Sequence, residues 1–205
     1  MQMNRTKSSV VIAGFILGAL GVGSIIHEGG HVLGATMCGQ KIEAIAVAPG
    51  IQIYPVLQKR DWPGYATWIE LSPSEDESCT GWIFLMGSLT TAALSYAGVI
   101  VLLLRPAGLF LRLLVVFTAA FAADIVCYTF LPLVGLRHWI FFGGTQAEPL
   151  IGVRAIGIPD VLFFSALALH AVLVSIALAY SFKLGRARSR LGAPSCQQPR
   201  SSATC

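Results

Sequence analysis

The sequence His27-Glu28-Gly29-Gly30-His31 interrupts a segment, Ser9–Cys38, that is otherwise apolar enough to lie in a lipid bilayer. Residues four positions apart lie on the same face of a helix, so the two histidines have the spacing needed to bind one zinc ion. Glu28 lies beside that position, where it could take a proton from a zinc-bound water. Because ionisable side chains are costly inside a membrane, those present usually have a function. The motif therefore predicts a metal site within the first span.

The composition places the whole chain in a membrane. Of its 205 residues, 55% are hydrophobic and only 12% are charged, whereas soluble domains carry about 25% charged residues. Four segments are long enough to cross about 30 Å of hydrocarbon. They are Ser9–Cys38, Gly81–Leu104, Gly108–Val134 and Val161–Phe182. We therefore expect an all-α membrane protein, a bundle of about four transmembrane helices that forms one polytopic domain over residues 1–183. Residues 184–205 read as a disordered basic tail.

The charges predict the orientation of the chain. The N-terminus, the turn Arg105–Arg112 and the C-terminal tail carry nine basic residues and no acidic one, and the other two loops carry eight of the ten acids. The positive-inside rule then predicts a multi-pass protein with both termini cytoplasmic. Arginines that extend to the membrane surface and fix the orientation of the helices explain the basic tail better than nucleic-acid binding does. We therefore expect no nucleic-acid partner. The N-terminal segment is too long for a signal peptide and is interpreted as an uncleaved span.

The two outer loops have different characters. Lys41–Ala48 and Ile51–Leu57 flank the turn dipeptide Pro49-Gly50, which predicts a small β-hairpin after the first helix. This hairpin could offer an edge strand to an extended peptide or pack over the end of the bundle. The segment Leu136–Pro159 is too polar to cross, so we expect it on the outer surface or beside the bundle.

Small residues and cysteines add two further expectations. The many glycines of the first span predict close packing against other helices, and Gly29 and Gly30 also leave space for a substrate backbone beside the metal. Cys38 and Cys79 lie at the outer ends of their spans and could form a disulfide, although five free thiols are an equal alternative.

Hydrolytic zinc sites usually have a third protein ligand. Asp124 is the first candidate, because it lies well inside the third span at a depth similar to that of His27. The alternative role for Asp124 is a polar bridge to Tyr128 or to a neighbouring hydroxyl. His170, near the middle of the fourth span, is the second candidate. Two further carboxylates at the outer boundary are expected to be solvated, namely Glu148 and Asp160.

These features resemble the site-2 protease family of intramembrane zinc metalloproteases. The family combines an HExxH helix, a β-hairpin loop and a following span that opens with a Gly-Pro-Leu-x-Asn-like element. Gly87-Ser88-Leu89-Thr90-Thr91 stands in the place of that element, with Ser88 and Thr91 replacing proline and asparagine. Asp124 lies in a different local sequence from the family's aspartate. The resemblance covers about residues 18–132, and it implies zinc on His27, His31 and an aspartate of a later span.

The sequence thus predicts a zinc metalloendopeptidase that cleaves membrane-embedded protein substrates within the bilayer. Zn²⁺ is held by His27, His31 and Asp124, and Glu28 is the general base. The main alternative is a catalytically silent zinc-binding membrane protein that binds a partner. A small metal or proton transporter is a third possibility, but the second and fourth spans offer it few polar residues.

Overall fold

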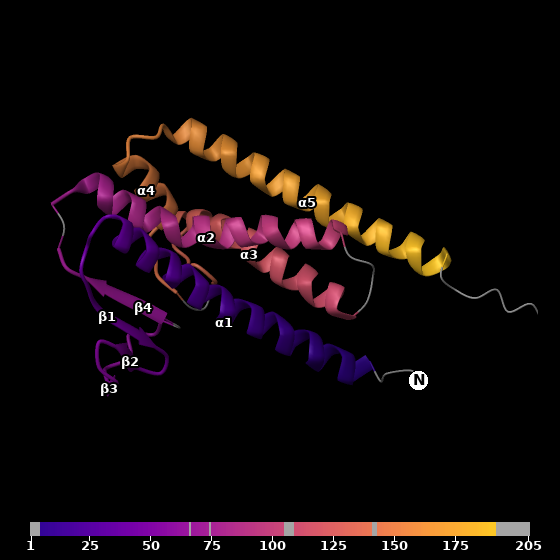
Figure 1. Cartoon of the computed structure of the whole chain (residues 1–205), viewed down its shortest axis with the longest axis horizontal. Helices are drawn as coiled ribbons and strands as arrows, with labels where there is room; N and C mark the ends of the chain where they lie inside the picture. Colours follow the sequence, from indigo (N-terminus) through magenta and orange to yellow (C-terminus); the bar gives the residue numbers. More distant parts are fainter. Residues whose placement is uncertain (1–4, 66, 74, 105–108, 141–142, 192–205) are drawn as a thin grey trace, which may run out of the picture.

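The computed structural model describes residues 5–65, 67–73, 75–104, 109–140 and 143–191. This part of the chain folds into five helices and a small antiparallel sheet (Figure 1). The helices are α1 (Arg5–Met37), α2 (Glu77–Leu104), α3 (Leu109–Leu133), α4 (Glu148–Ala155) and α5 (Asp160–Leu191). The strands are β1 (Ile42–Val47), β2 (Ile51–Tyr54), β3 (Gln58–Lys59) and β4 (Thr67–Leu71).

Four of the described helices are long and apolar enough to cross a membrane, as the sequence predicts. The apolar spans are Ile16–Met37, Glu77–Leu104, Leu113–Leu133 and Asp160–Ser181. Large apolar side chains point outward from them, among them Leu17, Leu104 and Val161, each at least 68% exposed. Since water-soluble proteins seldom expose such extensive apolar surface, these helices suggest a membrane protein.

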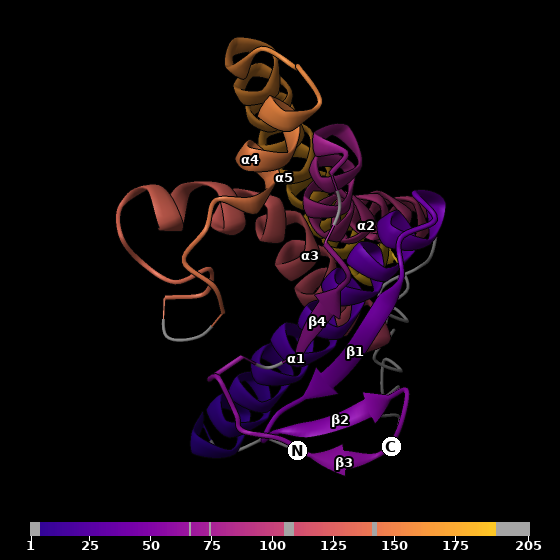
Figure 2. The same ribbon diagram turned by 90° about the vertical axis from the view of Figure 1, so that its left-hand side faces the viewer.

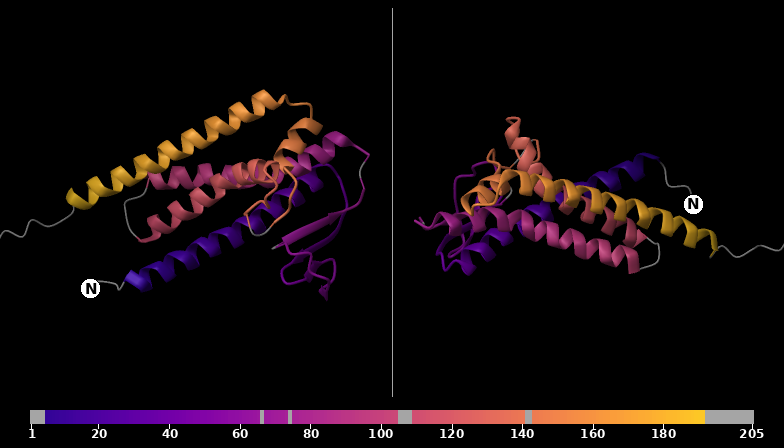
Figure 3. Two further views of the ribbon diagram at one scale, coloured as in Figure 1. Left: turned by 180° about the vertical axis from the view of Figure 1, so that it is seen from behind. Right: turned by 90° about the horizontal axis from the view of Figure 1, so that it is seen from above.

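The described part of the bundle has two different ends. The N-terminal end of α1 and the C-terminal end of α5 lie at one end, together with the end of α2 and the start of α3 (Figure 1). The sheet and α4 lie at the other end, and Figure 3 shows the same arrangement from behind and from above. The acidic loops are therefore grouped apart from the basic termini, in the arrangement that four antiparallel spans require.

The predicted hairpin is present, but it belongs to a wider sheet. β1 and β2 pair antiparallel, and a turn between them is closed by a hydrogen bond from the Gly50 N–H to the Val47 carbonyl of 2.9 Å. The strand order is β3-β2-β1-β4. Both edges of the hairpin are thus covered by other strands, and β4 instead forms an edge of the sheet. Figure 2 looks onto this end and shows β4 in front of α1.

Local signals set the ends of the two helices that lead into and out of the sheet. After α1, Gly39 adopts a positive φ of 67°, and the N–H groups of Gly39 and Gln40 donate to the carbonyls of Thr36 and Ala35. This is the Schellman arrangement that closes a helix at a glycine. At the start of α2, the Asp76 carboxylate accepts hydrogen bonds from the first free N–H groups of the helix.

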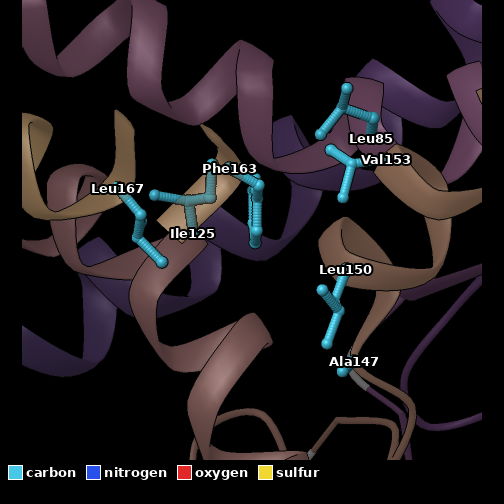
Figure 4. Packing of buried hydrophobic residues seen from close by; sticks show 7 residues of the cluster. All are labelled: Leu85, Ile125, Ala147, Leu150, Val153, Phe163 and Leu167. Atoms are coloured by element: carbon cyan, nitrogen blue, oxygen red, sulfur yellow. The ribbon is translucent and has the colours of Figure 1, made fainter. Parts of the chain in front are cut away.

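The segment 136–159 does not cross the bundle, and part of it packs as α4 against the membrane helices. Its apolar side chains join a buried cluster with residues of α2, α3 and α5 (Figure 4). The cluster consists of Leu85, Ile125, Ala147, Leu150, Val153, Phe163 and Leu167. Gly81 and Gly152 let α2 and α4 approach backbone to backbone, because a Cβ on Gly152 would lie 2.7 Å from the Gly81 carbonyl oxygen. Together these contacts fix α4 against the bundle.

Two further expectations are settled by the described residues. α5 continues to Leu191, so residues 184–191 are helical rather than part of a disordered tail, and residues 192–205 lie outside the description. Cys38, Cys79 and Cys127 are free thiols, and the Cys38 thiol contacts the Cys79 carbonyl oxygen at 3.7 Å. The alternative of a Cys38–Cys79 disulfide is therefore not realised.

Candidate metal centre

His27 and His31 lie one turn apart on α1, and both are buried in the interior of the bundle. Their ring centroids are 4.8 Å apart with the rings nearly perpendicular. Nδ1 of His31 donates to the Ile83 carbonyl at 2.7 Å, and Nδ1 of His27 donates to the Asp124 carboxylate at 2.9 Å. Since both Nδ1 atoms are hydrogen-bond donors, each neutral ring has its lone pair on Nε2.

Asp124 is placed differently from the predicted third ligand. Its carboxylate faces Nδ1 of His27 rather than the Nε2 atoms, and it is fully buried. The same oxygen accepts hydrogen bonds from Ser88 at 3.1 Å and Thr91 at 2.8 Å. These hydroxyls stand where the family element has proline and asparagine. Asp124 therefore orients the His27 ring through Nδ1, the nitrogen that does not face Glu148. Metal-binding histidines commonly donate this second ring N–H to a carboxylate.

The carboxylate that faces both Nε2 atoms belongs to Glu148, the first residue of α4. Its Oε2 lies 3.3 Å from Nε2 of His27 and 3.4 Å from Nε2 of His31. Burial by itself raises the pKa of Glu148, but the contacts with His27 and His31 outweigh it and hold this pKa well below its ordinary value. Glu148 is thus ionised at neutral pH. Among the described residues, the group that could hold a metal ion is His27, His31 and Glu148.

The chemistry of this group calls for a cation. When both rings are neutral, two lone pairs and one carboxylate oxygen converge, and none of the three can donate a hydrogen bond to another. A second proton on each ring would resolve the conflict, but it would bury two adjacent imidazolium ions. One divalent ion brings the same charge of +2. With bond lengths near 2.0–2.1 Å, neighbouring ligand atoms of tetrahedral zinc are about 3.3 Å apart. The two measured separations match that value, and all three ligand atoms lie within 4.8 Å of one another, so this group could hold a metal ion.

Two glycines bring the helices close enough to form this group. A Cβ on Gly87 of α2 would lie 2.6 Å from Nε2 of His27 and 2.7 Å from Nε2 of His31. A Cβ on Gly30 would overlap the Met86 carbonyl and lie 2.8 Å from the Gly87 Cα. Gly30 is therefore a packing contact with α2 rather than an open surface for substrate. Gly29, by contrast, has no such atom within 4 Å of its Cβ position among the described residues.

A cavity of about 340 Å³ opens beside the histidines. It is lined by α1, β4 and the segment 143–148, and Glu28, His31 and Glu148 all contribute to its wall. Glu28 is only partly buried and lines the cavity together with His31, whereas the fully buried His27 does not line it. The predicted general base and the metal-binding group thus share one cavity.

Two aromatic rings extend the site on the side of α3. Tyr128 stacks on His27 with ring centroids 3.9 Å apart and on His138 at 3.8 Å. Nε2 of His138 donates to the Gln146 carbonyl at 2.6 Å, and burial lowers the pKa of His138 below its ordinary value. His138 is therefore neutral near pH 7. It lies in a loop with no metal-ligand spacing, so the sequence carries no signal for its place here.

The remaining candidate ligands lie elsewhere. Nδ1 of His170 is bonded to the Tyr96 hydroxyl at 2.8 Å, and Nε2 of His170 donates to the Ala122 carbonyl at 3.1 Å. His170 thus joins α5 to α2 and α3. Asp160 forms a two-bonded ion pair with Arg154 on the surface.

No protein-family model matches this chain, and the comparisons with curated proteins and with solved structures also find no match. The proposals below therefore depend on the geometry of the site.

Proposed function

We propose that this chain is an intramembrane zinc metalloendopeptidase, with zinc on His27, His31 and Glu148 and with Glu28 as the general base. The observation that carries the proposal is the convergence of His27, His31 and Glu148 beside a cavity whose wall includes His31, Glu148 and the carboxylate-bearing Glu28. Two imidazole nitrogens and one carboxylate oxygen are a ligand set typical of hydrolytic zinc. The resemblance of residues 18–132 to the site-2 protease family supports the roles of His27, His31 and Glu28, but it implies an aspartate in place of Glu148 as the third ligand.

The residues of the cavity have complementary parts in peptide hydrolysis. A bound zinc ion would supply Lewis acidity and make water more acidic. Glu28 accepts the proton of the attacking water and later gives it to the departing amine. Asp124 keeps the proton of His27 on Nδ1, so that Nε2 faces Glu148.

A peptide can reach these groups along β4. This strand has no partner on its outer edge within the described sheet, and its residues line the cavity. A substrate helix must be unwound before cleavage, because its carbonyls are hydrogen-bonded within the helix. An extended segment could then pair with β4. The substrate we infer is therefore a membrane-embedded protein segment in an extended conformation, and the charge pattern favours a site on the non-cytoplasmic side.

Cleavage by purified protein tests this proposal. The zinc-loaded wild type would be reconstituted with a panel of apolar single-span peptides, and the products would be identified by mass spectrometry. We expect cleavage by the wild type and at least a 100-fold lower rate for Glu28→Gln, which keeps the ligands and removes the base. Equal zinc content in the two proteins is the control. A zinc-loaded wild type that leaves the whole panel intact would contradict the proposal and favour the silent partner-binding alternative.

A further inference from the structure

Tyr128 is held in one position beside the candidate metal centre. Its ring is 5% exposed and lies between the rings of His27 and His138, with interplanar angles of 28° and 30°. It is also one turn after Asp124 on α3, on the face that meets α1. A ring stacked on both sides cannot swing away, so its hydroxyl is fixed relative to the histidines.

The hydroxyl of Tyr128 has a proton to donate. The indole N–H of Trp139 lies beside this hydroxyl, but the indole nitrogen is buried and makes no hydrogen bond among the described residues. Because an indole N–H can only donate, it does not compete for the phenolic proton. Tyr128 also lines the cavity, and it interacts electrostatically with Glu28 and Glu148. Tyr128 thus contributes a hydroxyl-bearing ring to the same cavity wall as Glu28 and Glu148.

The ring N–H groups nearest to the cavity are already engaged. Nδ1 of His27 donates to Asp124, Nδ1 of His31 donates to the Ile83 carbonyl, and Nε2 of His138 donates to the Gln146 carbonyl. A neutral His138 then presents only a lone pair on its other nitrogen. None of these three rings can stabilise new negative charge in the cavity without breaking a bond that it has.

We propose that the Tyr128 hydroxyl donates a hydrogen bond to the substrate's carbonyl oxygen as negative charge develops there. This inference rests on the peptidase function proposed above. When the water oxygen bonds to the carbonyl carbon, the π electron pair moves to the carbonyl oxygen and Glu28 takes the water proton. Tyr128 keeps its proton throughout and only shares it. When the carbon–nitrogen bond breaks, the electron pair returns to re-form the carbonyl and Glu28 protonates the amine.

The substitution Tyr128→Phe tests this role, because it removes one oxygen and keeps the stacked ring. A preorganised donor to a developing oxyanion contributes about 100-fold to kcat. We therefore expect Tyr128→Phe to lower kcat by about 100-fold, to change KM by less than threefold, and to keep its zinc content. Tyr96→Phe is the matched control, since it deletes a hydroxyl bonded to His170 in the same bundle. It should retain the wild-type kcat.

The outcomes separate the two proposals. A wild type that cleaves no peptide refutes the peptidase function itself. An active wild type with an equally active Tyr128→Phe variant overturns the role of Tyr128 alone. Loss of zinc in Tyr128→Phe would also overturn it, since the hydroxyl would then be needed to maintain the metal site rather than to act on the substrate. A fall in kcat in Tyr65→Phe instead would assign the donor to the other tyrosine hydroxyl that reaches this cavity.

Discussion

Gly87→Ala should abolish metal binding while leaving the fold intact. The added methyl carbon would lie 2.6 Å from Nε2 of His27, whereas ordinary contact begins at 3.4 Å. The imidazole must therefore move about 0.8 Å, and His31, at 2.7 Å, must move by a similar amount. Metal sites tolerate deviations of about 0.2 Å in ligand distance. Because both nitrogens are displaced, we expect zinc affinity to fall by at least 100-fold, beyond the 10- to 100-fold effect of disturbing an outer contact.

The stability cost of this substitution is small enough for the variant to fold. Overpacking costs about 1–3 kcal/mol. Alanine regains about 1 kcal/mol over glycine within a helix, so the net cost is about 0–2 kcal/mol. Gly21→Ala on α1 is the matched control, since its Cβ would meet no atom within 4 Å. Zinc affinity is measured by chelator competition on proteins of equal size-exclusion profile. A Gly87→Ala affinity within threefold of the wild type would refute this reading of the geometry.

Two further predictions concern the supports of the site. Asp124→Asn should weaken zinc binding by about 10- to 100-fold in chelator competition, because the carboxylate that orients His27 becomes an amide. His170→Ala is the control: it removes a contact with Tyr96 and should bind zinc as the wild type does. Complete loss of zinc from Asp124→Asn would instead favour Asp124 as a direct ligand. Gly152→Val should lower the zinc content of the purified protein, since the valine side chain would push α4, and with it Glu148, away from α2. An unchanged zinc content would show that the position of Glu148 does not depend on this packing.

Much of the fold follows from local sequence signals. The four apolar runs predict the long helices because a helix satisfies its own backbone in lipid. Pro49-Gly50 predicts the turn between β1 and β2, since these residues are typical of turns. β4 was not predicted, because Thr67–Leu71 is short and has no turn signal that ties it to β1. Its pairing joins residues 20 to 29 positions apart, from Val47 with Thr67 to Ile42 with Leu71, and local patterns do not specify such contacts.

The candidate site was predictable only in part. The HExxH spacing brings His27 and His31 to one face of α1, and comparison of depths correctly brings Asp124 close to His27. Depth alone, however, does not tell which ring nitrogen a carboxylate meets. Glu148 was expected to be a solvated loop residue, because its place depends on the docking of α4 through Gly81 and Gly152. That contact joins residues 71 positions apart, and no periodicity in the sequence encodes it.

The most direct test of the central claim is an anomalous difference map from crystals of the zinc-loaded wild type, collected on both sides of the zinc absorption edge. We predict one strong peak within about 2.0–2.2 Å of Nε2 of His27, Nε2 of His31 and a carboxylate oxygen of Glu148. A zinc-loaded crystal with no peak there, or with the ion bound to Asp124 while Glu148 points away, would contradict the account.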